Sequence, residues 1–345
     1  MEGNYTHQSI FLELKVAYLY YINNNTQNEI AKQLGVSVPT VSRLLKKAKE
    51  EKIIEFVIRD PYLECIHLEE KLKEAFHLKE TIIAPGFYID DLGEEQNYTD
   101  NGDSVKNLVA LEGARYLQRI IKENDVLGVT WGSTVYQMIN YLNPAQKVDA
   151  TFVTLHGSIA SVAPELDVRT LVSRISKGFA GKNYPLLTEA LMSSKSTADI
   201  IKQEKNISRV YDFFDKINIS VAGTGSFYPE MRSILGTEEF MSKEDIENLK
   251  EQNVVGDIAL RFFDREGKEC QTSLVDRMIS IDFDKYKKIP TKIVVASGVH
   301  KAYTILSALK GGLIDVLIVD YELGLKILEF YQNEKNHFDE KLLEN

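Results

Sequence analysis

Three short segments of the sequence carry residue types that bind anions and sugars. In the first, GVTWGSTV at residues 128–135, Gly132 permits close approach of the backbone, and Ser133 and Thr134 offer hydroxyl and amide groups. A helix is predicted to start there, so its dipole and free N–H groups favour an anion. The same pattern is typical of a plain strand-to-helix turn capped by Ser or Thr, and the segment by itself leaves both interpretations open.

The other two segments each add a charged side chain. In ASGVHK, Gly298 follows a predicted strand and Lys301 lies in the first turn of the next helix, where a lysine could swing over the same anion. In VVGDIALRFF, Asp257 interrupts an apolar run, and a carboxylate there could accept hydrogen bonds from sugar hydroxyls. The ordinary alternatives are a solvated lysine and a turn or capping aspartate. We favour a binding role for Lys301.

Weaker signals lie in two further loops and in the single tryptophan. His156 and Gly157, in HGS, follow a predicted strand, and a loop histidine there is either a ligand contact or purely structural. The GTG of residues 223–225 is interpreted as a turn that lines the pocket, because a dinucleotide fingerprint would need a third glycine. For Trp131 we favour core packing beside the turn over sugar stacking.

These segments must be positioned by an α/β domain. Predicted strands and helices alternate from about residue 81 onwards, which favours a mostly parallel sheet with ligands beyond the carboxyl ends of its strands. The predicted strands cover residues 81–86, 125–130, 150–157, 217–225, 254–264, 291–298 and 314–320. The predicted helices cover residues 62–78, 105–121, 133–142 and 299–312, and residues 89–103 are expected to form a polar loop.

The first sixty residues have the pattern of a helix-turn-helix. Thr26 and Glu29 form a capping box, Gly35 ends that helix, and Ser37 can cap a second one with Pro39 in its first turn. An apolar helix at residues 11–22 precedes them, and the small Ala31 would let the two later helices cross closely. The β-rich KIIEFVIRDP that follows suits a wing or short strand.

The second of these helices is the candidate DNA reader. Residues 39–52 hold five Lys/Arg and two acids, which suits phosphate contacts. An ordinary helical hairpin with a solvated basic face is the alternative. The residues expected to contact DNA are Thr26, Ser37, Pro39, Thr40, Ser42, Arg43, Lys46 and Lys47.

Bulk properties limit the class of protein. The length of 345 residues suits two domains. The sequence has no run of 18 apolar residues, so no membrane span is predicted, and its N-terminus lacks the pattern of a signal peptide. Residues 1–60 carry 8 Lys/Arg and 7 Asp/Glu, a net +1 in a chain of net charge −10. Cys65 and Cys270 are expected to be thiols. We therefore expect a cytoplasmic protein.

Together, these N-terminal and later segments resemble the SorC-type transcriptional regulators. The resemblance rests on residues 19–61, where the VSRLL-x-x-A run at Val41–Ala48 is its most specific part, and on three later segments. These are GVTWGSTV, GDIALRFFDREG with the later DRMISI, and ASGVHKAYTILSALKGGLIDVLIVD. The family combines a helix-turn-helix with a sugar-phosphate-sensing domain whose fold is similar to that of ribose-5-phosphate isomerase and glucosamine-6-phosphate deaminase.

The resemblance also implies roles for individual residues. It puts Asp257 where the family has an acidic ligand contact, and His156 where its members often have a basic residue. A histidine there would make phosphate binding weaker or pH-dependent. The residues expected to bind the effector are Gly132, Ser133, Thr134, His156, Gly157, Asp257, Gly298 and Lys301.

The sequence thus predicts a small N-terminal all-α helix-turn-helix domain at residues 1–60, with a winged form as the alternative, a connecting helix at 61–80, and a phosphosugar-isomerase-like effector and oligomerisation domain at 81–345. The expected function is a repressor of a sugar-utilisation operon that binds operator DNA as a homo-oligomer, dimer or tetramer, under control of a phosphorylated sugar. No cofactor and no metal are expected. The alternative is an isomerase-like enzyme with a DNA-binding arm, for which no spacing pairs an acid with a base.

Overall fold

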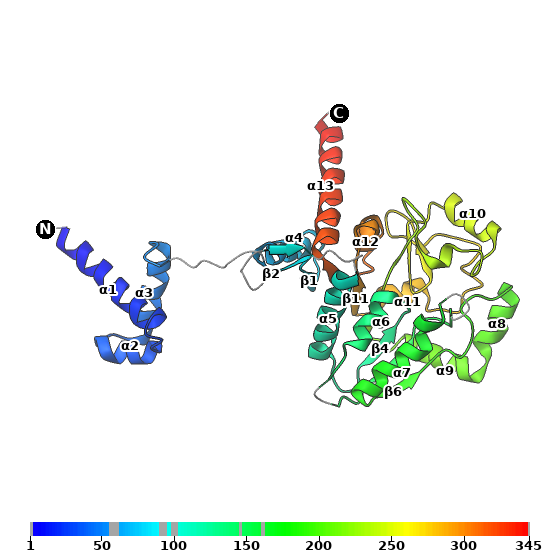
Figure 1. Ribbon diagram of the computed structural model, residues 1–345, viewed down its shortest axis with the longest axis horizontal. Helices are drawn as coiled ribbons and strands as arrows, with labels where there is room; N and C mark the ends of the chain where they lie inside the picture. The colour runs from blue at the N-terminus through cyan, green and yellow to red at the C-terminus, as the bar shows by residue number, and fades with distance from the viewer. Residues whose placement is uncertain are drawn as a thin grey trace. The chain divides into compact units, whose positions relative to one another are not determined.

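The computed structural model describes residues 3–54, 62–89, 95–97, 103–144, 147–159 and 163–343. The chain divides into two compact units, Met1–Asp60 and Pro61–Asn345 (Figure 1). Within the described ranges, no helix is both long enough and apolar enough to cross a membrane. Cys65 and Cys270 are buried free thiols.

The N-terminal unit consists of three helices, α1 (Gly3–Tyr21), α2 (Gln27–Leu34) and α3 (Val38–Glu50). The predicted capping box is present, because the Glu29 amide donates to Thr26 Oγ1 and the Thr26 amide donates to Glu29 Oε2. Gly35 adopts the left-handed conformation, with φ of 66°, and ends α2. The Ser37 hydroxyl accepts from the Thr40 amide at the start of α3. These local signals define the helix-turn-helix.

A small apolar core joins the three helices. It contains Val16 and Leu19 from α1, Ile30 and Ala31 from α2, and the apolar face of α3 that includes Val41. The predicted strand after α3 lies mainly outside the described residues. Of its first residues, the Ile53 amide donates to the Ala48 carbonyl, so the chain turns there after the helix.

The large unit is built on a seven-stranded sheet in which every strand is parallel to its neighbours. This confirms the predicted α/β class. The strand order is β1-β12-β11-β7-β4-β5-β6. The strands are β1 (Glu80–Ala84), β4 (Val126–Val129), β5 (Thr151–Thr154), β6 (Lys182–Tyr184), β7 (Ile219–Ala222), β11 (Thr291–Ala296) and β12 (Val316–Asp320).

Helices cover both faces of this sheet, as expected when crossover connections join parallel strands. One apolar core lies between the sheet and α5 (Asp103–Ile120), α6 (Ser133–Asn140) and α7 (Val168–Phe179). The other lies between the sheet and α4 (Tyr62–Phe76), α9 (Lys205–Phe214), α11 (Phe283–Lys288), α12 (Ala302–Lys310) and α13 (Tyr321–Leu343). The helix predicted as a connector, α4, packs against β1 and α13 within the large unit.

A smaller sheet corrects one predicted strand. Residues 254–264 form two strands, β9 (Gly256–Ile258) and β10 (Arg261–Phe263), which pair antiparallel, with β8 (Gly225–Ser226) on the other side of β9. Ala259 and Leu260 make the turn with φ of 53° and 61°. Neither alanine nor leucine favours a positive φ, so no turn-forming residue marked this position in the sequence. The apolar pattern therefore predicted one continuous strand.

Further elements were not predicted. The region expected to be a polar loop, residues 89–103, contains β3 (Glu95–Asn97), which pairs antiparallel with β2 (Phe87–Ile89) at the start of that region. The helix predicted at 299–312 begins as a short 3-10 turn, η3 (Val299–Lys301), before α12. The remaining elements are α8 (Lys195–Gln203), α10 (Lys243–Glu251), η1 (Pro164–Leu166) and η2 (Ile234–Gly236).

Candidate functional site

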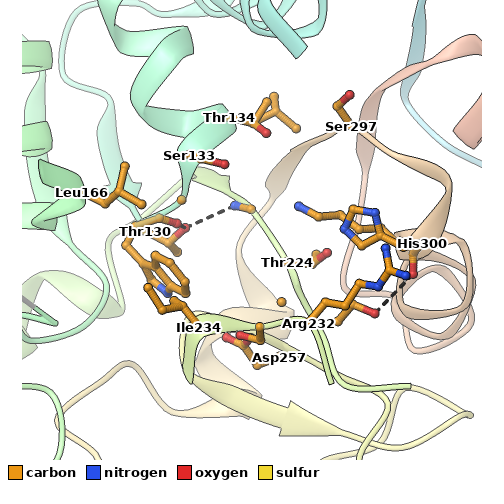
Figure 2. Close-up of a pocket in the computed structure, with 18 of the residues that line it drawn as sticks. Thr130, Ser133, Thr134, Leu166, Thr224, Arg232, Ile234, Asp257, Ser297 and His300 are labelled. Carbon is orange, nitrogen blue, oxygen red and sulfur yellow. Dashed lines mark hydrogen bonds between the residues drawn. The ribbon is translucent and has the colours of Figure 1, made fainter. Parts of the chain in front are cut away.

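A pocket of about 360 Å³ lies beyond the carboxyl ends of β4, β7 and β11 (Figure 2). From β4 the chain continues outward through β5 and β6, and then returns to place β7 on the other side of β4. This is a topological switch point, where loops diverge and leave room for a ligand. The lining residues used below are Lys106, Trp131, Gly132, Ser133, Thr134, Thr224, Arg232, Asp257, His300 and Lys301.

The first turn of α6 faces this pocket. Gly132 precedes the helix with φ of 149°, a conformation that favours glycine, and no side chain caps the helix. The first backbone N–H groups of a helix have no partner within it, so those beside Ser133 and Thr134 are available to an anion. Ser133 is exposed and Thr134 is buried, and both line the pocket.

Lys301 reaches the same pocket from η3, which follows β11. Burial lowers its pKa to about 8, the Asp257 carboxylate opposes this shift, and the charge of Lys106 adds to it. Lys106, from the first turns of α5, forms an ion pair of 2.7 Å with Asp103 and also lines the pocket. Two lysines and the first turn of α6 therefore line the same partly desolvated pocket, where an anion would be held strongly.

Two buried oxygen atoms at the pocket have no hydrogen-bond partner. These are Oδ1 of Asp257, a residue that is 2% exposed, and Oγ1 of Thr224, which is 7% exposed. Burial raises the pKa of Asp257 to about 7, although backbone N–H groups of Leu260 and Gly225 and the charge of Lys301 favour the ionised form. Because buried polar groups are nearly always paired, these two unpaired oxygens set Asp257 and Thr224 apart from the other polar residues of the lining.

Replacing Asp257 by asparagine is expected to stabilise the empty chain above pH 7. The folded chain holds the Asp257 proton more tightly than the unfolded chain does. Ionisation of Asp257 therefore destabilises the fold by its full amount above about pH 7, and it has no effect below the pKa of Asp257 in the unfolded chain. The variant should gain about 2 to 5 °C in Tm at pH 8 and nothing at pH 4. Thermal unfolding of Asp257→Asn and of the exposed control Asp276→Asn checks this, and equal gains at both pH values would contradict it.

His156 does not line the pocket, which corrects its predicted role. It is fully buried, its Nε2 accepts from the Trp131 backbone N–H at 3.0 Å, and its Nδ1 lies 2.7 Å from the Gly157 carbonyl oxygen. These contacts require a neutral ring with the proton on Nδ1. Burial lowers the pKa of His156 to about 4, so it does not titrate near neutrality. The histidine supports the backbone at Trp131 from within the protein.

Gly157 and Gly298 also lie outside the lining, for different physical reasons. A Cβ at Gly157 would lie 2.5 Å from the Glu189 carbonyl oxygen, so glycine is required by backbone packing. Gly298 has φ of 100° and its amide donates to Asp320 Oδ2 at 2.7 Å. It therefore shapes the turn that carries Lys301 without itself reaching the pocket.

Several lining residues were missed by sequence reasoning. Lys106, Thr224, Arg232 and His300 come from four different segments, and none of them was named as an effector contact. Thr224 lies within the GTG turn that was predicted to line the pocket, and His300 lies within ASGVHK, adjacent to Lys301. For Lys106 and Arg232 the sequence offered no signal. Trp131 lines the pocket and also packs against the apolar cluster beneath the small sheet, so its fluorescence can report binding.

A second candidate surface lies on α3 in the N-terminal unit. Ser42, Arg43 and Lys46 are exposed, as is Pro39, while Thr40 is half-buried. Within the described residues no acidic side chain pairs with Arg43, and Lys46 lies 3.8 Å from Glu50 across an exposed helical turn. An exposed ion pair of this kind contributes little to stability, so Lys46 can exchange the Glu50 carboxylate for a DNA phosphate at little cost.

Lys47, Thr26 and Ser37 have structural partners within the N-terminal unit, and only those of Lys47 were not predicted from the sequence. Lys47 Nζ donates to Oε1 of the buried Glu13 at 2.6 Å and also pairs with Glu51 at 3.2 Å. These partners raise the pKa of Lys47 and compensate its charge, so it ties α3 to α1. The hydroxyls of Thr26 and Ser37 cap helices, although both residues remain exposed. Their DNA contacts stay a prediction.

Comparison with known proteins decides the family. Residues 60–329 match the family model described as "Putative sugar-binding domain", and residues 23–55 match the winged helix-turn-helix DNA-binding model. The structure is similar to that of the full-length sorbitol operon regulator SorC from Klebsiella pneumoniae, with a TM-score of 0.70, 27% identity, and coverage of 93% of this chain and 99% of that one. The chain belongs to the SorC family of transcriptional regulators.

Two SorC-family relatives show how far the similarity extends. The sorbitol operon regulator of Klebsiella pneumoniae is 29% identical over 93% of this chain and 98% of its own. The deoxyribonucleoside regulator of Bacillus subtilis is 28% identical over 90% and 94%. Both are named as regulators, and the present SorC-family chain is likewise a transcriptional regulator with a helix-turn-helix and a sugar-binding domain, not an enzyme.

Proposed function

We propose that this regulator represses a sugar-utilisation operon and that a phosphorylated sugar bound in the pocket controls it. The pocket carries the proposal, because it combines two kinds of recognition. The start of α6, with Lys106 and Lys301, suits a phosphate, and the unpartnered oxygens of Asp257 and Thr224 suit sugar hydroxyls. Similarity to regulators named for sorbitol and for deoxyribonucleosides supports a sugar-related effector.

Operator recognition is assigned to α3. In a helix-turn-helix the second helix enters the major groove, and the N-terminal half of α3 presents Thr40, Ser42 and Arg43 for base or phosphate contacts. A homo-oligomer would present two such helices to two half-sites. Effector binding would shift the population of oligomer arrangements that match the half-site spacing, and so release the operator.

A binding screen tests the proposal. The full chain is titrated with pentose and hexose monophosphates and with the corresponding free sugars, while Trp131 fluorescence is followed. We expect at least one sugar phosphate to bind saturably, without turnover, and the free sugar to bind at least about 100-fold more weakly. The same sugar phosphate should lower the affinity for an operator that was selected from random DNA duplexes.

Each other outcome contradicts a definite part of the proposal. Equal affinity for the free sugar would remove the phosphate from the assignment. Tighter operator binding in the presence of the effector would show that the effector promotes DNA binding, and it would contradict a repressor that the effector releases from the operator. If no sugar phosphate binds, as checked by calorimetry, the effector assignment is wrong.

A further inference from the structure

Asp320 lies at the carboxyl end of β12 and is not among the residues that line the pocket. Its side chain is 3% exposed, and each of its two carboxylate oxygens accepts a hydrogen bond from a backbone N–H group. Oδ2 accepts from Gly298 at 2.7 Å, and Oδ1 accepts from Leu323 at 2.9 Å. The first bond holds the turn after β11, and the second caps the first turn of α13. One buried carboxylate therefore joins these two segments.

The turn that Asp320 holds leads directly into η3, which carries Lys301. Gly298 precedes η3 with φ of 100°, and the Lys301 amide donates to the Gly298 carbonyl at 3.1 Å. The hydrogen bond between Gly298 and Asp320 therefore determines where η3 begins, and with it the position from which Lys301 reaches the pocket. Within η3, the His300 carbonyl accepts from the Ser226 hydroxyl at 3.2 Å, so the small sheet also supports this turn.

The negative charge of Asp320 also acts on Lys301. Burial lowers the pKa of Lys301 to about 8, the charges of Asp257 and Asp320 oppose this shift, and the charge of Lys106 adds to it. His300, the neighbouring titratable group on η3, has a lowered pKa because it is partly buried and lies near Lys301, so its ring is neutral above pH 7. Asp320 thus helps to keep the Lys301 ammonium, which binds phosphate, protonated to a higher pH.

The helix that Asp320 caps, α13, packs against α4 (Figure 1). The hydroxyl of Tyr321, the first residue of α13, donates to Glu64 Oε2 on α4 at 2.7 Å, and this hydrogen bond raises the pKa of Tyr321 to about 12. One turn further along, a Cβ at Gly324 would lie 3.0 Å from Leu68 Cδ2 on α4, so the backbone of α13 lies close to that helix. A shift of the first turn of α13 would therefore be felt by α4.

We propose that Asp320 is a positioning residue of the effector site, and that Asp320 and Tyr321 together transmit the binding of a phosphate at η3 to α4. The inference rests on the proposed function, since the group that Lys301 binds is the phosphate of the sugar. When Lys301 engages this phosphate, η3 moves with it, and the shared carboxylate passes the change to α13. α4 begins at Tyr62, next to the boundary between the two units at residues 60 and 61, so it is the helix of the large unit that is nearest in the chain to the helix-turn-helix.

Asp320→Asn tests the positioning role. Asparagine has one acceptor oxygen where aspartate has two, and it has no charge. We expect the affinity for sugar phosphates to fall about 10- to 100-fold, the range for hydrogen bonds to a charged group. The loss of affinity with rising pH should also begin at a lower pH, because Lys301 loses its proton more easily without the charge of Asp320.

Calorimetric titration of the full chain between pH 6 and pH 9 measures both effects. The probes are glucose 6-phosphate, fructose 6-phosphate and ribose 5-phosphate. The matched control is Asp125→Asn, because Asp125 Oδ2 likewise accepts a backbone N–H group, that of Lys122 at 2.7 Å, but lies at the amino end of β4. We expect this control to bind the probes as the parent chain does at every pH.

Tyr321→Phe tests the connection to α4. The variant removes one hydroxyl group outside the lining, so the affinities for the probe alone and for the operator alone should stay as in the parent chain. We expect the factor by which the probe weakens operator binding to fall about 2- to 30-fold, the range for one residue that couples two sites. Fluorescence anisotropy with a selected operator duplex, with and without saturating probe, measures this factor. The matched control is Tyr184→Phe, whose hydroxyl accepts from Arg209 at 3.5 Å on β6, at the far edge of the sheet.

The outcomes separate this inference from the proposed function. If Asp320→Asn binds the probes more weakly but with the parental pH dependence, Asp320 is only a helix cap and the inference fails, as it does if nothing changes. If Tyr321→Phe keeps the parental factor, or weakens the probe as much as Asp320→Asn does, the connection to α4 is wrong and the proposed function stands. If no probe binds the parent chain, both the inference and the effector assignment fail.

Discussion

Replacing Arg43 by alanine is expected to lower operator affinity by about 10- to 100-fold, the range for an arginine that contacts a base. Arg43 is exposed on α3, and it forms no ion pair with an acidic side chain among the described residues. Its removal leaves the apolar face of α3, including Val41 and Leu44, intact. Fluorescence anisotropy with a selected operator duplex and with a scrambled duplex measures both affinity and specificity.

Lys15→Ala is the matched control for Arg43→Ala, because it removes one exposed positive charge from α1 in the same unit. We expect this control to bind the operator nearly normally. Loss of affinity for operator and scrambled DNA alike would make Arg43 a phosphate contact without a role in sequence discrimination. Unchanged operator affinity in Arg43→Ala would show that α3 is not the reading helix.

Replacing Lys301 by methionine is expected to abolish the response to the effector and preserve operator binding. The methionine retains an apolar stem in the desolvated pocket, so the fold should be kept while the positive charge of Lys301 is lost from the lining. We expect effector affinity to fall by about 100-fold, and the operator complex to persist at effector concentrations that dissociate it in the parent chain. Calorimetry and anisotropy measure the two effects.

The pH dependence provides an independent readout for Lys301. In the empty pocket its pKa is lowered to about 8, so the ammonium is lost as the pH rises through that value. Effector affinity of the parent chain should therefore decrease between pH 7 and pH 9, and this decrease should be absent in Lys301→Met. Lys288→Ala, which removes an exposed lysine of α11, should behave as the parent chain. A normal effector response in Lys301→Met would remove Lys301 from the site.

Local sequence signals determined much of the architecture. Thr26, Glu29, Gly35 and Ser37 define the helix-turn-helix, because caps and a left-handed glycine act within a few residues of the chain. The alternation of apolar strands with helices determined the parallel sheet and hence the edge at which ligands bind. For the same reason GVTWGSTV could be placed at that edge, although a plain turn fitted it equally well.

Tertiary structure decided which loops share the pocket and which charges are available. Thr224, Arg232 and Lys106 meet there only because β7 returns beside β4, an arrangement set by the packing of the whole sheet. Burial made His156 a neutral support, and the buried Glu13 gave Lys47 a structural partner. Desolvation and long-range pairing depend on residues far apart in the chain, so no local pattern in the sequence could show them.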